Sequence, residues 1–221
     1  MKVKLFPAGV PIRKRILDLA LAGIGFILIS PLLAMIACLV WVTMGRPIVF
    51  KQKRPGYRGE PFVLLKFRTM SQNQDPVGGL LPDSQRLTRL GRILRSFSLD
   101  ELPEILNVLR GEMSLVGPRP LLMDYLGRYS PEQFRRHNVL PGMTGWAQVN
   151  GRNTLNWSEK FAYDLWYVDH WSFGLDVRIL ALTLWKAVLR QGVSPPGMDT
   201  SPEFKGGEDL PGSASSRETD P

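Results

Sequence analysis

The stretch that decides the fold is the apolar run LALAGIGFILISPLLAMIACLVWVTM, residues 19–44. It contains no charged side chain, although the 221-residue chain as a whole is only 44% hydrophobic. At about 1.5 Å per residue, a helix of this length would exceed the roughly 30 Å hydrocarbon core of a bilayer. The run therefore predicts a membrane helix near the N-terminus.

Two features bear on how this helix meets the membrane. Pro31 follows Ser30 near the middle of the run, and a proline inside a helix removes a backbone hydrogen bond and kinks the helix. The Ser30 hydroxyl could bond back to a carbonyl that the proline leaves unpaired. Basic residues also flank both ends of the apolar run, and this favours a cytoplasmic position for both ends. These residues are Arg13, Lys14 and Arg15 before the run and Arg46, Lys51, Lys53 and Arg54 after it. A helix that enters, breaks at Ser30-Pro31 and returns fits this pattern, and a simple transmembrane helix is the alternative.

The charge balance suggests the kind of partner. The chain carries a formal charge of +8, and its tail from residue 191 has two basic and six acidic residues, so the remainder carries +12. A basic body beside an apolar segment suits an anionic lipid surface or phosphorylated substrates. Nucleic acid would also suit the charge, but a long uncharged segment is not typical of a nucleic-acid binder. The single cysteine, Cys38, excludes an intrachain disulfide.

The rest of the chain is predicted to form short helices and short β-strands. We expect a β-hairpin from residues 48–51 and 62–66, a loop over 71–83, and helices over 86–96 and 98–109, the second ending at Gly111. Further along, the pattern predicts a short helix over 131–138, a strand over 143–149 and helices over 157–168 and 175–190. The last helix has an apolar face through Leu180, Leu184 and Val188 that lies either in the membrane interface or in the core.

Candidate chemistry lies in SLDELP, residues 98–103. Pro103 is tolerated only in the first turn of a helix, so the helix should begin near Ser98 to Asp100. Asp100 and Glu101 would then lie at the positive end of the helix dipole, where both carboxylates stay ionised. An ionised carboxylate can attack phosphorus or hold a divalent cation. The structural alternative is a capping box formed by Ser98 and Glu101.

The surroundings favour the chemical interpretation. Basic residues are concentrated around the carboxylate pair, and rigid arginines suit bidentate contacts to phosphate. Arg119 is held between two prolines, which is a poor position for a residue that only aids solubility. The predicted phosphate-binding residues are Lys66, Arg68, Arg95, Arg119 and Arg152.

Several motifs together resemble one family. SLDELP (98–103) and NVLRGEMSLVGPRP (107–120) closely resemble the signature of the monotopic bacterial sugar transferases. This family is also called the phosphoglycosyl transferases or undecaprenyl-phosphate sugar phosphotransferases. The resemblance extends over roughly residues 12–190, through KRILD (14–18), Ser30-Pro31, KFRTM (66–70) and PGMTGWAQVNGR (141–152). The small form of the family is expected, without a large membrane domain ahead of Lys14.

The resemblance implies a ping-pong reaction. Asp100 would attack the β-phosphate of a UDP-sugar, release UMP and hold the sugar phosphate covalently until a polyprenyl (undecaprenyl) phosphate takes it. Glu101 would assist, Arg119 would bind a phosphate, and Mg²⁺ near Asp100 would neutralise the diphosphate. The resemblance also implies the re-entrant helix, at the cytoplasmic face of the bacterial inner membrane.

The predicted chain is therefore α+β and mainly helical, in three parts. Residues 1–46 form the re-entrant membrane helix, residues 47–190 form a small cytoplasmic catalytic domain with a short β-hairpin and interfacial amphipathic helices, and residues 191–221 form a disordered tail. The expected partners are a UDP-sugar, a polyprenyl phosphate and anionic lipid, without nucleic acid, and a homodimer is left open. The alternatives are a non-catalytic membrane-surface module, which would not need the Asp-Glu pair, and a nucleic-acid-binding protein.

Overall fold

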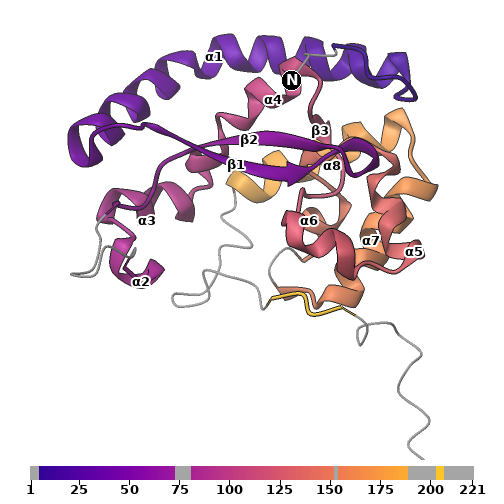
Figure 1. Ribbon diagram of the computed structural model, residues 1–221. Helices are drawn as coiled ribbons and strands as arrows, with labels where there is room; N and C mark the ends of the chain where they lie inside the picture. Colours follow the sequence, from indigo (N-terminus) through magenta and orange to yellow (C-terminus); the bar gives the residue numbers. More distant parts are fainter. Residues whose placement is uncertain (1–4, 73–80, 152–153, 189–202, 207–221) are drawn as a thin grey trace, which may run out of the picture. The chain divides into compact units, whose positions relative to one another are not determined.

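The computed structural model describes residues 5–72, 81–151, 154–188 and 203–206 (Figure 1). Its described part is mainly helical and includes two small two-stranded sheets, so the predicted α+β class with a β-hairpin is confirmed. The chain forms two compact units. The first comprises Met1–Lys53 and Phe62–Leu115, and the second comprises Arg54–Pro61 and Val116–Pro221.

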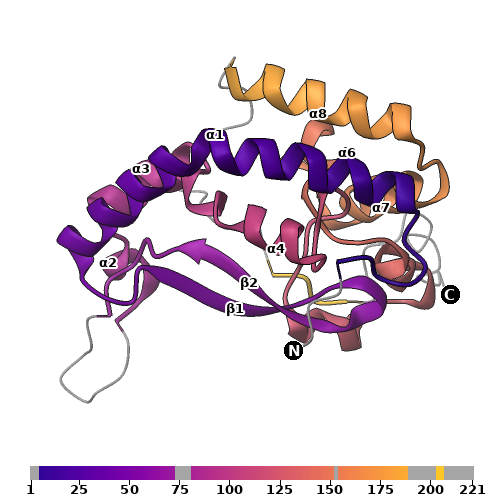
Figure 2. The same cartoon turned by 90° about the horizontal axis from the view of Figure 1, so that it is seen from above.

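The first unit is built around one long helix. Its elements are α1 (Ile12–Met44), most of the hairpin β1 (Val49–Pro55) and β2 (Pro61–Phe67), α2 (Asp83–Arg86), α3 (Arg89–Ser96), the 3₁₀ turn η2 (Leu99–Glu101) and α4 (Glu104–Arg110). Gly111 ends α4 in the left-handed conformation with φ 83°, as its position predicts. In Figures 1 and 2, α4 runs beside α1, and the two helices are in contact.

Helix α1 has 33 residues and continues through Pro31 without interruption, so the predicted break of the helix at Ser30-Pro31 is not formed. Among the described residues it is the one helix long and apolar enough to cross a membrane. Pro31 has no N–H to donate to the Ile27 carbonyl four residues earlier, and the Ser30 hydroxyl donates to that same carbonyl oxygen at 2.8 Å. The predicted bond from Ser30 is therefore confirmed. The ribbon of α1 bends along its length (Figures 1 and 2).

Both ends of α1 are fixed to the first unit. At the N-terminal end, Arg15 is fully buried and its Nη2 donates to the Val108 carbonyl at 2.6 Å, at the end of α4. Asp18 Oδ1 accepts hydrogen bonds from Ser114 Oγ at 2.9 Å and from the Leu115 N–H at 3.0 Å. In the second half of α1, a buried apolar cluster joins the helix to β2 and α3; its members are Ile36, Val40, Phe67 and Leu94.

The predicted helix over 86–96 begins later than expected, as α3 at Arg89, and Arg86 ends the preceding helix α2. Leu87 forms an isolated bridge with Met70, and α3 begins only after Thr88, whose side chain accepts the Gly91 N–H at 2.9 Å as an N-cap. A Cβ at Gly91 would lie 2.0 Å from the Thr69 carbonyl oxygen, so the close approach of α3 to this strand-like segment requires glycine.

The second unit consists of short elements followed by two longer helices. They are η1 (Tyr57–Gly59), the end of β3 (Ser114–Val116), η3 (Met123–Arg128), α5 (Pro131–Phe134), η4 (Arg135–Asn138), β4 (Gly142–Thr144), α6 (Trp146–Asn150), α7 (Trp157–Asp169) and α8 (Phe173–Val188). An Asn156–Glu159 capping box begins α7. Strand β4 pairs with β3, and just beyond them the Gly117 N–H donates to the Thr144 carbonyl at 2.9 Å.

The predicted strand over 143–149 is wrong beyond Thr144. The chain turns into helix α6 at Gly145, where a Cβ would meet the Gly117 carbonyl oxygen at 2.2 Å. A short apolar run can form either a strand or a buried helical turn, and periodicity over seven residues does not separate the two.

The apolar face of α8 is exposed in the described part of the chain. Val177 is 47%, Leu184 69% and Trp185 62% exposed, whereas Ile179 on the opposite face is fully buried. The side chain of Val188 lies outside the described residues. The face that the sequence singled out is therefore directed outward and does not form the core of its unit.

Candidate active site

The carboxylate pair lies on η2, between α3 and α4 of the first unit. Asp100 is 9% exposed, and the side chain of Glu101 is 18% exposed. A helical turn begins within the predicted residues 98–100, but it is the 3₁₀ turn η2, and α4 begins only at Glu104 with Pro103 at its N-cap. Pro103 has no N–H for an α-helical bond to Leu99, and the Leu102 N–H instead makes a 3₁₀ bond to the Leu99 carbonyl at 3.4 Å.

The capping box predicted from Ser98 and Glu101 is also not formed. Ser98 adopts the left-handed conformation with φ 54° and makes no side-chain capping bond to the turn. Glu101 is paired with a lysine instead: Lys66 Nζ on β2 lies 2.7 Å from Glu101 Oε1 and 3.4 Å from Glu104 Oε1. The structure thus joins the predicted residues Lys66 and Glu101 directly.

Glu104 is a residue that the sequence interpretation missed. It is 3% exposed, and it shares Lys66 with Glu101. Its position one turn after Asp100 was a usable signal, since residues three or four apart lie on one face of a helical segment.

The electrostatic setting of Asp100 differs from the one expected at a helix N-terminus. Burial raises the pKa of Asp100 above its ordinary value, the neighbouring Glu101 charge raises it further, and the charges of Lys66 and Arg95 oppose the increase. Asp100 lies in the short 3₁₀ turn η2 and not at the N-terminus of α4, so the expected effect of an α-helix dipole does not apply in that form. The charges of Lys66 and Arg95 and a backbone hydrogen bond favour the charged form of Asp100. A carboxylate with a raised pKa is more basic in its charged form and is a stronger nucleophile.

The two predicted arginines of this unit have different surroundings. Arg95, on α3, donates from Nε to Thr69 Oγ1 at 3.1 Å. Arg68 is buried and donates to carbonyls at the C-terminal end of α1, those of Met44, Gly45 (2.9 Å) and Arg46 (3.2 Å). This placement gives Arg68 the role of a C-terminal helix cap, which the sequence did not indicate.

A buried asparagine connects the strand of Lys66 to the helix that follows Asp100. Asn107 is fully buried; its Oδ1 accepts the Leu65 N–H at 3.1 Å, and its Nδ2 donates to the Val63 carbonyl at 2.7 Å. Nδ2 also lies 2.6 Å from Glu112 Oε2. Asn107 therefore holds β2 against α4 and fixes the spacing between Lys66 and the carboxylates.

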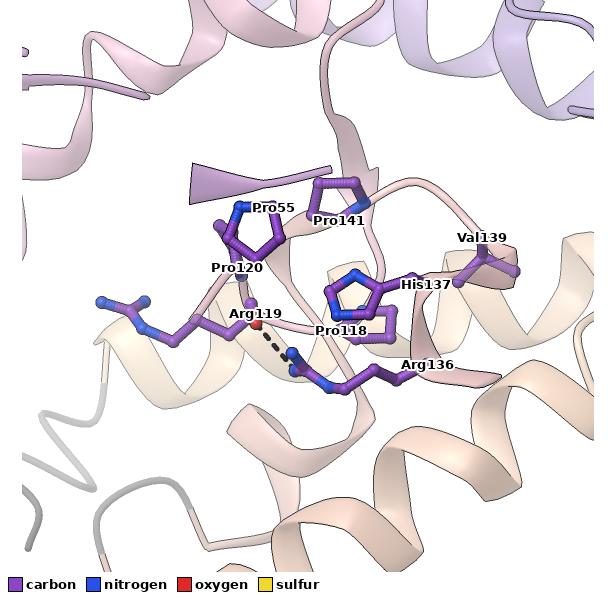
Figure 3. A pocket seen from close by; sticks show the side chains of 8 residues that line it. All are labelled: Pro55, Pro118, Arg119, Pro120, Arg136, His137, Val139 and Pro141. Atoms are coloured by element: carbon purple, nitrogen blue, oxygen red, sulfur yellow. Dashed lines mark hydrogen bonds between the residues drawn. The ribbon is translucent and has the colours of Figure 1, made fainter. Parts of the chain in front are cut away.

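Arg119 belongs to the second unit, in the turn Pro118-Arg119-Pro120. Its carbonyl accepts a hydrogen bond from Arg136 Nη2 at 2.7 Å, and Arg136 forms a buried ion pair with Asp164 at 2.7 Å. Figure 3 shows a small hollow lined by prolines, His137 and Arg136, with the Arg119 side chain pointing away from it. The backbone of the turn is thus held by the buried Arg136.

A second cation lies near Arg119. The pKa of Lys160 is lowered, first by burial and then by the positive charge of Arg119. Lys160 Nζ also lies 4.7 Å from the centre of the Trp157 ring. Two neighbouring cations suit an anionic ligand such as a phosphate, and Lys160 was not among the predicted residues. Arg152 lies outside the described residues.

Asp100 could serve as one ligand of the predicted magnesium ion, but the described side chains do not provide a complete set of ligands. The described part of the chain contains no group of three or more His, Cys, Asp and Glu side chains that could hold a metal. Mg²⁺ commonly binds one or two carboxylates together with substrate phosphates and water. Asp100 supplies one such carboxylate, while Glu101 is occupied by Lys66.

Comparison with known proteins places the chain in a family. The model of the bacterial sugar transferase family matches residues 10–190. An uncharacterized sugar transferase, EpsL of Bacillus subtilis, is 50% identical over 90% of this chain and 98% of its own length. The exopolysaccharide production protein ExoY of Sinorhizobium fredii is 37% identical over 82% of this chain and 88% of its own length.

A relative with a named reaction is longer. The UDP-glucose:undecaprenyl-phosphate glucose-1-phosphate transferase of Klebsiella pneumoniae is 42% identical over 80% of this chain, but this chain spans only 40% of it. The family match covers α1, the carboxylate pair and the Arg119 turn together. The protein is an enzyme that belongs to the bacterial sugar transferase family.

Proposed function

We propose that this protein transfers a sugar 1-phosphate from a UDP-sugar to a polyprenyl phosphate such as undecaprenyl phosphate, with release of UMP. The observation that carries the proposal is the buried Asp100 carboxylate, next to Glu101 and within the influence of Lys66 and Arg95. Relatives whose names specify sugar-phosphate transfer to undecaprenyl phosphate give the reaction class. The identity of the sugar is left to experiment.

The proposed reaction has two displacements at phosphorus. The ionised Asp100 carboxylate attacks the β-phosphorus of the UDP-sugar, the phosphoanhydride bond breaks, and UMP leaves. An oxygen of the polyprenyl phosphate then attacks the same phosphorus, which breaks the bond to Asp100 and gives a polyprenyl diphosphate sugar. Asp100 is regenerated, so atoms and charges balance over the two steps.

The other residues serve this sequence. Lys66 and Arg95 favour the ionised form of Asp100. Glu101 accepts the proton that a protonated acceptor phosphate carries, and Arg119 with Lys160 binds phosphate oxygens. Mg²⁺, when bound at Asp100, supplies positive charge that neutralises the diphosphate and the departing UMP.

The way in which α1 is anchored supports a re-entrant topology. A straight helix of 33 residues would separate its ends by about 50 Å, at about 1.5 Å per residue. Yet Arg15 near its start binds the end of α4, while Arg68 binds the carbonyls at its end, and both partners belong to the same unit. A bent but uninterrupted helix that is fixed at both ends to one unit suits entry from, and return to, the cytoplasmic face of the inner membrane. The outward apolar face of α8, with Leu184 and Trp185, suits the membrane interface.

The topology has its own test. Single cysteines at either end of α1, in a Cys38→Ala background, are labelled from outside intact cells with an impermeant thiol reagent. Protection of both ends is expected, and labelling of the N-terminal end alone would show that the helix spans the membrane. Pro31→Ala should straighten α1 and increase labelling of the N-terminal end.

The activity is tested by UMP release. Purified protein is incubated with Mg²⁺, undecaprenyl phosphate and a panel of UDP-sugars. UMP should appear with at least one donor, and Asp100→Asn should abolish it without loss of folding. Asp124→Asn, in η3 of the second unit, is the matched control and should keep the wild-type rate. Equal turnover by Asp100→Asn and wild type would exclude Asp100 as the nucleophile. Absence of UMP with every donor would exclude sugar-phosphate transfer from a UDP-sugar.

A further inference from the structure

Four aromatic side chains of the second unit form a box around a ring from the C-terminal tail. The ring is that of Phe204, which is fully buried, and its centre lies 5.1–5.8 Å from the centres of all four. The four members are Tyr125, Tyr129, Trp157 and Phe161, hereafter the aromatic box. These separations fall in the range that aromatic pairs prefer. The structure therefore departs from the expected disorder of the tail at residues 203–206, drawn in yellow in Figure 1.

The backbone of the tail segment is bound as well as its ring. The Phe204 N–H donates to the Tyr125 hydroxyl at 3.2 Å, and its carbonyl accepts from Arg128 Nη1 at 2.5 Å. The same Arg128 atom lies 2.7 Å from Glu203 Oε1. Gly206 follows with φ 82°, and a Cβ there would meet Arg128 Cβ at 3.2 Å. Main-chain hydrogen bonds combined with one buried side chain are the contacts by which proteins bind extended peptides.

The box and its occupant come from different parts of the chain. All four box residues lie within the family match over residues 10–190, while Phe204 lies outside it. Of the four described tail residues, only Phe204 has a buried side chain, and Glu203 and Lys205 on either side of it are exposed. Such a segment can leave its site without unfolding the unit that binds it.

We propose that the aromatic box is a peptide-binding site whose occupant is the chain's own segment 203–206, with Phe204 as its anchor. The site takes an extended segment in which an acidic residue precedes an aromatic one: Arg128 binds the acid and the aromatic box takes the ring. The box shares Trp157 with Lys160, but none of its members is a carboxylate of the transfer reaction. Peptide binding at the box and the proposed activity are therefore tested by separate measurements.

Hydrogen exchange on the full chain in mild detergent tests the proposal. In the wild type, the Phe204 amide, which donates to the Tyr125 hydroxyl, should exchange at least about ten-fold more slowly than in a free peptide, yet faster than the core amides of α7, because the segment opens locally. Phe204→Ala should lose the tail protection while α7 keeps its own. Lys205→Ala, which changes an exposed neighbour, should retain the protection.

Two results would overturn the proposal. Exchange of the wild-type tail at the free-peptide rate would show that the box is empty in solution. Exchange of the tail at the same rate as α7 would show that Phe204 is an ordinary core residue that opens only on global unfolding. Both comparisons are made in the wild type, so the test holds even if Phe204→Ala does not fold.

Discussion

Replacing Asn107 with alanine should destabilise the first unit by a calculable amount. Asn107 is fully buried and makes three hydrogen bonds, to the Leu65 N–H, the Val63 carbonyl and Glu112. Alanine leaves the two backbone groups of β2 without this partner in a buried position. Each buried polar group left unsatisfied costs about 1–3 kcal/mol. The expected loss in the free energy of unfolding is therefore roughly 2–6 kcal/mol, counting the two backbone groups.

Chemical unfolding in mild detergent measures this loss. The matched control is Asn150→Ala, which removes a single exposed bond to the Trp146 carbonyl and should change stability by less than about 0.5 kcal/mol. Since β2 carries Lys66 and α4 follows Asp100, the folded fraction of Asn107→Ala should also turn over more slowly than wild type. A stability change as small as that of the control would refute the view that Asn107 holds β2 against α4.

Three further predictions concern the second unit. Burial lowers the pKa of His137 to about 4, so between pH 4 and about 6.5 the unfolded state binds the extra proton. The free energy of unfolding should then fall on acidification through that window by up to about 1.4 kcal/mol per pH unit, and His137→Asn should flatten the slope in denaturant titrations. Leu184→Glu should weaken membrane association in flotation assays and leave the melting temperature unchanged, whereas Ile179→Glu should unfold the second unit. Unfolding by both substitutions would show that the apolar face of α8 belongs to the core. Arg119→Lys should lower the turnover rate about ten-fold or more, which corresponds to about 1.4 kcal/mol in the activation barrier. A wild-type rate would show that bidentate binding of phosphate by Arg119 is not needed.

Local sequence rules predicted much of the fold. The length and apolar composition of residues 19–44 predicted α1, Gly111 predicted the end of α4, and the bond from Ser30 followed from the missing N–H of Pro31. Each of these features depends on residues close together in the chain. The carboxylate pair and Lys66 were also chosen from sequence, and the structure brings them together.

The features that sequence rules missed depend on distant contacts. Glu104 lies one turn after Asp100, which a local pattern can show, but the lysine that it shares comes from β2. Arg68 binds carbonyls of α1, and that contact is not visible in a local pattern. Phe204 lies in a polar, Gly- and Pro-rich segment, and nothing local indicates that four aromatic rings surround it. The sign of the pKa shift at Asp100 likewise depends on its burial, which the helix-dipole argument did not include.

The most direct test of the central claim is the intact mass of the protein after incubation with a UDP-sugar and Mg²⁺ in the absence of a lipid acceptor. The wild type should gain the mass of one sugar phosphate, and peptide mapping should place it on Asp100. Glu101→Gln should still form some adduct while turning over slowly, and Asp100→Asn should form none. An adduct on another residue, or product formation without any adduct, would contradict the covalent role of Asp100 and favour direct attack by the lipid phosphate.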